Sequence, residues 1–281
     1  MKIAMIIPYF GTWPEWMDLY LYSCSKVQYI DFLFYTDCLI PRKIYDNTIF
    51  KQLTFKEYCD KVSTALNIHF NPCRPYKLCD LKPFYGVVHN EELRDYDWWG
   101  FSDIDLVYAE LGKFVNEENM KGHDILTTHV DRVAGHFTII RRKSKYNDIA
   151  FRIKGWREML TDDKNHGIDE GDFSGIVKPL KIKIFDKLYY YIIRHVFGEI
   201  NKHALYNLWQ KLTCFIPCRV LMAEFFTTFK PMRETYCIYN LATGKLDVHT
   251  DVLKCVSGGQ NILAFFILQA NKILGYRPIL A

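Results

Sequence analysis

The chain has 281 residues, of which 49% are hydrophobic and 16% aromatic, and its formal net charge is +4. This length and apolar content can build a sizeable core, which argues against a disordered protein. The positive charge is too mild to indicate nucleic acid, and with no zinc-finger or RNA-binding signature we expect no nucleic-acid partner. The nine cysteines form no convincing ligand set, and their odd number favours free thiols.

The amino-terminal part is predicted to form a βαβ unit. A strand over Ile3–Ile7 ends in Pro8-Tyr9-Phe10-Gly11, where proline and glycine stop the strand and let the backbone approach a ligand. A helix is expected at about Glu15–Lys26 and a second strand over Ile30–Asp37. This order favours a largely parallel sheet with a ligand crevice at the carboxyl ends of its strands.

Further elements follow in the same alternating pattern. Thr54–Leu66 is predicted to be a short helix, and Tyr76–Pro83 opens another. A strand over Trp98–Phe101 comes next, and Asp124–Thr128 and Gly135–Ile140 are expected to be two more strands. We therefore predict an α/β fold with a mostly parallel central sheet flanked by helices.

The pair Asp103-Ile104-Asp105 directly follows the strand over Trp98–Phe101. In an extended chain alternate side chains point to the same side, so the two carboxylates can share one hard cation such as Mn²⁺ or Mg²⁺. Such an ion is commonly shared with substrate phosphates, which suits the binding of a nucleotide diphosphate. By spacing alone, an Asp-x-Asp pair is more often a helix cap or a turn.

The carboxyl-terminal third has a different character. Residues 178–233 contain ten Lys and Arg against three Asp and Glu, interleaved with aromatic residues. This pattern fits either a solvated helical face over an aromatic core or a surface that rests on anionic lipid. A hairpin is expected over Tyr236–Val248, followed by an apolar segment over Ile262–Leu274. We divide the chain into a core that would bind a nucleotide diphosphate, residues 1–177, and a basic, aromatic-rich helical and carboxyl-terminal region, residues 178–281.

Six motifs occur in an order that resembles the glycosyltransferase-like proteins of bacterial capsule and surface-polysaccharide loci, which are similar to the GT-A glycosyltransferase superfamily. The resemblance covers residues 1 to about 175. The motifs that carry it are Ile6-Ile7-Pro8-Tyr9-Phe10-Gly11, Phe34-Tyr35-Thr36-Asp37, Tyr76-Lys77-Leu78-Cys79-Asp80-Leu81-Lys82-Pro83, Trp99-Gly100-Phe101-Ser102-Asp103-Ile104-Asp105-Leu106, Gly135-His136-Phe137 and Ile168-Asp169-Glu170. It implies a GT-A-like, Rossmann-like fold.

The resemblance also implies a nucleotide-binding side of the site. Pro8, Tyr9 and Gly11 would line the nucleotide pocket. Asp37 would face the base or the ribose. From the residues alone, Asp37 could equally be a turn residue that closes its strand.

The diphosphate and metal would be held by two motifs. Lys77 and Lys82 would neutralise the diphosphate, although Lys77 could also be a surface residue in the first turn of its helix. Asp103 and Asp105 would hold Mn²⁺ or Mg²⁺, with Asp105 the stronger ligand and Asp103 shared with the ribose.

The acceptor side would be formed by the last two motifs. His136 would border the sugar or the acceptor, and Asp169 with Glu170 would provide the acceptor-side carboxylate. The alternatives are a core histidine at His136 and an ordinary solvated acidic loop around Asp169 and Glu170.

The resemblance predicts a metal-dependent glycosyltransferase. It would transfer a sugar from a nucleotide donor, a UDP-sugar, to a glycan or lipid-linked acceptor of a bacterial surface polysaccharide. The sequence has no secretory-signal features and no run of the roughly 18–20 apolar residues that span a bilayer. We therefore expect the protein to be cytoplasmic, or peripheral on the inner face of the membrane.

One motif of the relatives fits loosely. At the carboxyl end they carry a Tyr-Ile-His-x-Gln-Lys-Arg type motif, whereas Phe266-Ile267-Leu268-Gln269 has neither the histidine nor the basic pair. This departure supports an alternative, a catalytically weak or inactive nucleotide-sugar-binding scaffold of a polysaccharide assembly complex. A third hypothesis, a nucleotidyltransferase, would need a glycine-rich basic loop after the first strand, which Pro8-Tyr9-Phe10-Gly11 does not provide.

Overall fold

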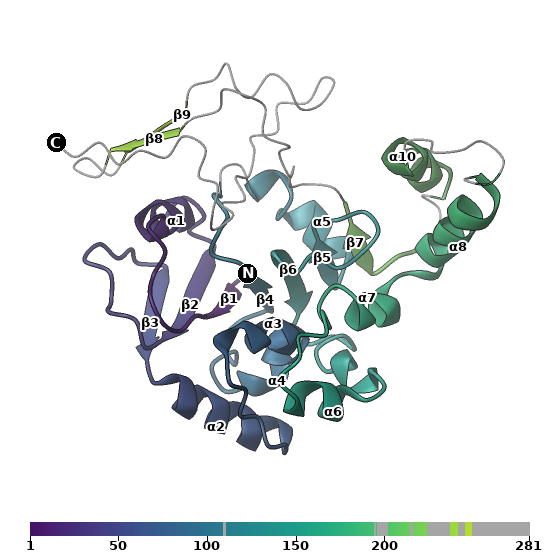
Figure 1. Cartoon of the computed structure of the whole chain (residues 1–281). Coiled ribbons are helices and arrows are strands. Elements are labelled where there is room, and N and C mark those ends of the chain that lie inside the picture. The colour runs from purple at the N-terminus through teal and green to yellow at the C-terminus, as the bar shows by residue number, and fades with distance from the viewer. Residues whose placement is uncertain are drawn as a thin grey trace.

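The computed structural model describes residues 1–108, 111–193, 195, 202–213, 216–223, 237–240 and 245–248. A seven-stranded sheet lies at its centre, with helices on both faces (Figure 1). The strands lie in the order β3-β2-β1-β4-β6-β5-β7. Their bounds are Ile3–Pro8 (β1), Ile30–Thr36 (β2), Thr48–Gln52 (β3), Trp98–Ser102 (β4), Ile125–Thr127 (β5), Phe137–Arg141 (β6) and Val220–Met222 (β7).

The sheet is mostly parallel. Only the pairings of β6 with β4 and with β5 are antiparallel, and the other four neighbouring pairs are parallel. The predicted α/β architecture, with a mostly parallel sheet flanked by helices, is therefore confirmed. The strand β3 was not predicted, because its sequence Thr-Ile-Phe-Lys-Gln is polar at its end and lies at the outside of the sheet, half exposed.

The predicted start of a helix is confirmed where a capping motif marks it. Thr54 caps α2 by accepting a hydrogen bond from the backbone N–H of Glu57, and the Glu57 side chain returns a contact to the Thr54 backbone. The segment predicted to open one helix at Tyr76 is a series of short turns, and Pro83, which has no N–H to donate, lies inside it. The helical elements are Met17–Cys24 (α1), Phe55–Leu66 (α2), Pro75–Lys77 (η1), Leu78–Leu81 (α3), Lys82–Phe84 (η2), Tyr85–Val88 (α4), Leu111–Lys113 (η3), Glu117–Gly122 (α5), Ile149–Arg152 (η4), Trp156–Thr161 (α6), Asp172–Val177 (α7), Leu180–Leu188 (α8), Tyr189–Ile193 (η5) and Lys202–Leu212 (α10).

The core lies on both faces of the sheet. Trp98 and Trp99 are neighbours in β4, and because strand side chains alternate, they belong to two different buried clusters. The cluster around Trp98 packs against α1 and α5, and the cluster around Trp99 packs against α2, α4 and α6. A sheet that is packed on both faces gives rigid support to the loops at the carboxyl ends of its strands.

One strand of the central sheet, β7, lies after residue 177. The strand β7 pairs in parallel with β5, with Leu126 opposite Leu221. The division proposed at residue 177 therefore does not coincide with the end of the central sheet.

The predicted hairpin is confirmed by β8 (Cys237–Asn240) and β9 (Lys245–Val248), which pair antiparallel. The segment Ile262–Leu274, with the loosely fitting motif at residues 266–271, lies outside the described residues.

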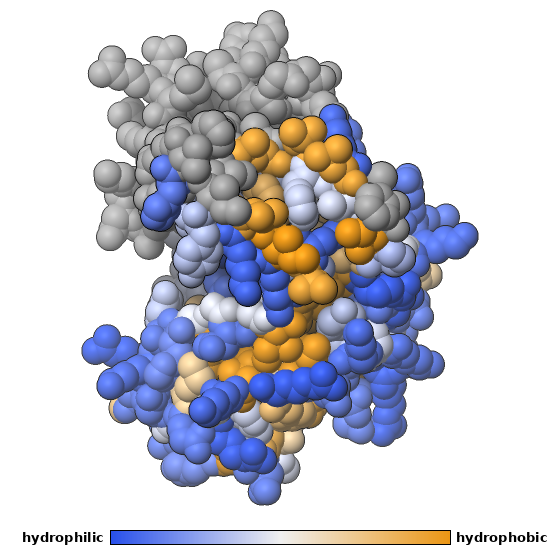
Figure 2. Space-filling model, turned by 90° about the vertical axis from the view of Figure 1, so that its right-hand side faces the viewer, coloured by the Kyte–Doolittle hydropathy of each residue, from blue (hydrophilic) through white to orange (hydrophobic). Residues whose placement is uncertain are grey.

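The region after residue 177 forms α8 and α10 on one side of the molecule (Figure 1). Figure 2 looks onto this side and shows apolar side chains gathered in a band, with strongly polar side chains next to it. The helices expose four large apolar residues, namely Leu180, Ile184, Leu208 and Leu212. Among the described residues, none of the helices has the length and apolar character needed to cross a membrane.

The thiols of six described cysteines are free. They are Cys24, Cys38, Cys59, Cys73, Cys79 and Cys218.

Candidate active site at the carboxyl ends of the strands

Three parallel strands, β1, β2 and β4, end at the same side of the sheet, so the loops that follow them meet there. The backbone N–H of Gly11, after β1, donates to Asp37 Oδ1, after β2, over 2.7 Å. The indole Nε1 of Trp16 donates to the carbonyl oxygen of Ile104, after β4, over 3.0 Å. The first hydrogen bond joins two of the motifs found in the sequence, and the second joins the segment before α1 to the Asp103-Ile104-Asp105 motif.

The loop after β1 has a fixed shape. Pro8 ends β1 opposite Tyr35, and the backbone N–H of Tyr9 donates to the Tyr35 carbonyl over 2.9 Å. The Tyr9 ring stacks on Trp13 with ring centroids 5.1 Å apart. Gly11 has φ +111°, a conformation that side chains disfavour, so glycine suits this position. The loop thus holds backbone and aromatic groups beside Asp37.

The two aspartates after β4 share one environment. Ile104, between them, is buried in the cluster on the α1 side of the sheet, while Asp103 and Asp105 are partly exposed. Burial raises the pKa of Asp105 to about 6, and the nearby carboxylate of Asp103 adds to this rise. Among the described residues, no lysine, arginine or histidine forms an ion pair with Asp105. The pair therefore carries negative charge that is only partly neutralised.

Lys82 neutralises the first of these aspartates from inside the protein. Its Nζ lies 2.7 Å from Asp103 Oδ1 and 3.5 Å from Asp169 Oδ2, and it donates to the Gly135 carbonyl over 2.9 Å. Burial disfavours the charged ammonium, but Asp103 and then Asp169 outweigh it, so the pKa of Lys82 is raised. The expected metal motif and the expected acceptor-side carboxylate thus share one lysine.

Lys77 has a different environment. Its buried ammonium lies 3.1 Å from Asp80 and 3.0 Å from Asp162, and it also donates to the carbonyl of Met159. Asp80 in turn accepts hydrogen bonds from the backbone N–H groups of His166 and Ile168. The protein itself encloses this ammonium, which favours a structural role for Lys77 rather than the neutralisation of a diphosphate.

The segment with Asp169 and Glu170 is fixed against the loop before β6. Asp169 is buried, and burial raises the pKa of its carboxyl while Lys82 opposes the rise. Glu170 is half exposed, and its Oε1 accepts a hydrogen bond from the Gly135 N–H over 3.1 Å. A Cβ atom on Gly135 would lie 2.5 Å from Asp169 Oδ2, so this close approach requires glycine.

His136 also lies next to the aspartate motif, because its carbonyl oxygen accepts a hydrogen bond from the Asp103 N–H over 3.1 Å. Its ring packs edge-on against His129, with ring centroids 4.8 Å apart. Burial, followed by the effects of His129 and Lys82, lowers the pKa of His136 to about 3, so the ring is neutral near pH 7.

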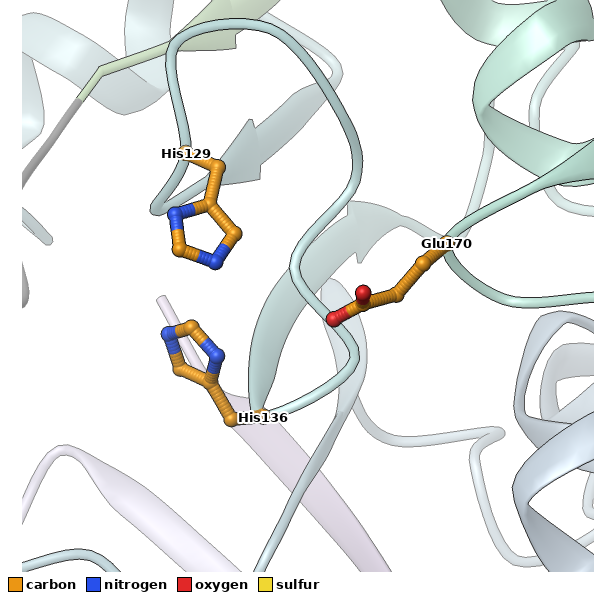
Figure 3. A group of neighbouring side chains, drawn as sticks. All are labelled: His129, His136 and Glu170. Carbon is orange, nitrogen blue, oxygen red and sulfur yellow. The ribbon is translucent and has the colours of Figure 1, made fainter. Parts of the chain in front are cut away.

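His129 and Arg132, which lie in the loop between β5 and β6, were not identified from the sequence. The only signal was the position of His129 just after a predicted strand, which does not show that it meets His136. Arg132 Nη2 lies 3.2 Å from His129 Nε2, and Arg132 Nε lies 3.4 Å from Glu170 Oε2. Figure 3 shows His129 and His136 facing each other across this loop, with Glu170 reaching in from a separate segment.

The Asp103-Ile104-Asp105 segment fits a divalent cation by its chemistry. Mg²⁺ and Mn²⁺ prefer carboxylate oxygens, and a partly buried carboxylate next to a second one is stabilised by a nearby cation. Asp105, with its raised pKa and the carboxylate of Asp103 beside it, is such a group. Because Lys82 already contacts Asp103 Oδ1, Asp105 and the other oxygen of Asp103 are the atoms suited to this ion.

The comparisons with known proteins give one family and distantly similar solved structures. A family model described as "Family of unknown function (DUF6625)" matches residues 5–212. None of the curated proteins is similar in sequence to this chain. Among solved structures, the galactosyltransferase LgtC in complex with donor and acceptor sugar analogs is 14% identical, with 61% of this chain and 72% of that chain covered and a TM-score of 0.34. An active-site mutant of LgtC is 13% identical, with 61% of this chain and 71% of that chain covered and a TM-score of 0.34.

Proposed function

This chain belongs to that family of unknown function, and we propose that it is a metal-dependent glycosyltransferase. It would transfer a sugar from a nucleotide-activated donor, a UDP-sugar, to a glycan or lipid-linked acceptor in bacterial surface-polysaccharide synthesis. One observation carries the proposal. Asp103 and Asp105 follow β4 at the carboxyl ends of the parallel strands, Lys82 is paired with Asp103, and the loop of Gly11 lies on Asp37 nearby.

In this proposal the chain prepares a site for a diphosphate and a nucleoside. The backbone of the loop from Pro8 to Gly11 would line the nucleotide, and Asp37, which orients Gly11, would face its ribose or base. Asp105 and one oxygen of Asp103 would hold Mn²⁺ or Mg²⁺. The ion would neutralise the leaving diphosphate. Lys82 fixes the Asp103 carboxylate from the protein side.

The acceptor would lie beside Asp169. Its carboxyl is buried and shares Lys82 with Asp103, so it lies next to the proposed metal motif. Burial raises its pKa toward the range in which a carboxylate can accept a proton from a hydroxyl group. Because burial raises the pKa of Asp169, we assign Asp169 the role of proton acceptor. Glu170, which contacts Arg132 and the Gly135 N–H, would have a positioning role. His136, neutral near pH 7, would border the acceptor.

The proposal is tested by calorimetric titration of UDP in the presence of Mn²⁺ and, separately, in the presence of a chelator. We expect binding with Mn²⁺, little binding with the chelator, and loss of binding in Asp105→Asn. The matched control is Asp46→Asn, an exposed turn residue outside the site. Slow hydrolysis of one donor from a panel of UDP-sugars would then identify the sugar. Equal UDP affinity in Asp105→Asn and the unaltered protein would refute the metal assignment.

We propose further that the side formed by α8 and α10 rests on an anionic membrane surface. Leu180 and Leu208 are exposed on these helices, and lysines such as Lys187 lie on the same helices. Apolar side chains that enter the headgroup region, together with lysines, are the features of interfacial helices. This position would bring a lipid-linked acceptor to the protein.

Sedimentation with phosphatidylglycerol vesicles tests this association. We expect binding at low salt, release as salt rises, and weaker binding in Leu180→Ser/Leu208→Ser. The control is Leu39→Ser, another strongly exposed leucine on a different segment of the chain. Failure to sediment at any ionic strength would refute the proposal for this surface without bearing on UDP binding.

A further inference from the structure

His129, His136 and Glu170 converge from two segments that are distant in sequence (Figure 3). Each offers one ligand atom, and the three atoms lie within 4.8 Å of one another. We propose that these side chains bind a divalent transition-metal ion of the zinc class, at a site distinct from Asp103 and Asp105. The inference rests on this cluster and does not depend on the proposed glycosyltransferase activity.

The donor set matches the chemistry of zinc. Two imidazole nitrogens and one carboxylate form a His₂Glu set, and zinc sites with three protein ligands keep a fourth position for water or a substrate group. Mg²⁺ prefers oxygen ligands, so this cluster and the two aspartates should select different metals. The structure therefore separates the two sites by chemistry as well as by residue.

Only a small contraction is needed to close the site. Tetrahedral ligand atoms around zinc lie about 3.4 Å apart, which follows from bond lengths of about 2.0–2.2 Å. The atoms here lie within 4.8 Å of one another, so each separation has to shorten by about 1.4 Å at most. Glu170 has the most room to move, because its side chain is 43% exposed, whereas both histidines are more deeply buried. In moving it would exchange its contacts with the Gly135 N–H and Arg132 for the metal ion. The exposed side of Glu170 also provides a route of entry.

Arg132 contacts two of the three proposed ligands. Because a guanidinium can only donate, His129 Nε2 must accept from Arg132, so this nitrogen carries its lone pair rather than a proton. Arg132 also lies 3.4 Å from Glu170 Oε2. A cation, the Arg132 guanidinium, thus already interacts with His129 and Glu170. Arg132 is 44% exposed and can withdraw when a metal ion enters.

The other histidine is oriented by a hydroxyl group. Thr128 Oγ1 lies 3.1 Å from His136 Nε2 and donates to the Phe137 carbonyl over 3.3 Å. When the Thr128 hydroxyl donates to that carbonyl, it accepts from Nε2–H, and Nδ1 is then the acceptor nitrogen of His136. A hydrogen bond that fixes the tautomer of a ligating histidine is the usual support of such a site.

Titration of the full chain with Co²⁺, a spectroscopic substitute for zinc, tests the proposal. We expect one equivalent to give the visible absorption of a four-coordinate site without the near-ultraviolet band of cobalt–thiolate bonds. That second feature excludes the nine cysteines as ligands. Stoichiometric Zn²⁺ should displace the cobalt and abolish the visible absorption.

Five variants test the assignment of the ligands. His129→Gln and Glu170→Gln should each lower Co²⁺ affinity by at least about tenfold. Arg132→Gln removes the competing cation and should raise the affinity. Asp105→Asn should leave the cobalt spectrum unchanged, although it abolishes Mn²⁺-dependent UDP binding. His166→Gln, at an exposed histidine paired with Asp162, is the matched control and should have no effect.

The outcomes separate the two proposals. A visible spectrum that is lost in His129→Gln and kept in Asp105→Asn supports the site, whether or not UDP binds. A spectrum lost in Asp105→Asn and kept in His129→Gln would assign the metal to the aspartates and overturn the inference. Absence of any four-coordinate spectrum in the unaltered protein and in Arg132→Gln would also overturn it. Because His129→Gln could alter folding, its circular dichroism spectrum is compared with that of His166→Gln.

Discussion

Lys82 Nζ lies 2.7 Å from Asp103 Oδ1, and this ion pair joins a helical turn to the loop after the central strand β4. The lysine side chain is 9% exposed, and Asp169 is its second acidic partner. A buried ammonium between two carboxylates is stabilising only while all three groups are present. The position of both acids in the candidate site therefore depends on this lysine.

Lys82→Met should lower the free energy of unfolding by about 3–5 kcal/mol, because it leaves Asp103 and Asp169 without their cation. The measurement is urea unfolding near pH 7. Lys56→Met is the control, since Lys56 and Asp60 form an exposed pair on α2, and such pairs contribute about 0–1 kcal/mol. Equal losses in the two variants would contradict a structural role for Lys82.

Gly135→Ala should displace Asp169, because the added Cβ would lie 2.5 Å from Asp169 Oδ2. We expect the free energy of unfolding to fall by about 1–3 kcal/mol, as for other overpacked sites, and donor hydrolysis to fall with it. Gly175→Ala in α7 is the control, since its Cβ would meet no atom within 4 Å. If both variants keep full stability and hydrolysis, Asp169 is not held by this contact.

Asp105→Asn should stabilise the metal-free protein in a pH-dependent way. The pKa of Asp105 rises from 3.8 to about 6 on folding, so the ionised carboxylate destabilises the folded state above about pH 6. The rise corresponds to about 3 kcal/mol, and it disappears below about pH 4, where the carboxyl is protonated in both states.

Urea unfolding with a chelator, at pH 8 and at pH 4, measures this effect. We expect Asp105→Asn to exceed the unaltered protein in stability at pH 8 and to match it at pH 4. Asp46→Asn provides the comparison at an exposed position. Lower stability of Asp105→Asn at pH 8 would show that the carboxylate has a stabilising partner. A variant that is more stable yet no longer binds UDP would link this residue directly to function.

Much of the fold could be predicted because local signals and the hydrophobic pattern agree. The capping box of Thr54 and Glu57 marks the start of α2, and the apolar run before Asp103 marks β4. The strand β3 was missed because its half-exposed, polar sequence has no clear period. The strand β7 was missed because three residues carry no pattern, and only its pairing with β5 defines it.

The site was predictable in its motifs but not in its contacts. The position of Asp103 after a buried strand follows from the sequence, whereas its partner Lys82 is fixed by tertiary packing. The same holds for Lys77, whose ammonium the fold encloses with Asp80 and Asp162. His129 was missed because a loop brings it to His136, and the path of a loop cannot be predicted from the spacing of residues in the sequence.

The short strand β7 has a consequence for the handling of this protein. Its pairing with β5 covers hydrogen-bonding groups that would otherwise be open to another chain, since a bare strand at the margin of a sheet is a template for aggregation. The family model ends at residue 212, eight residues before Val220. A polypeptide trimmed to that family region would keep Asp103, Asp105 and Lys82 but would leave β5 as the outer strand in place of the short β7, and we expect it to self-associate more readily than the full chain.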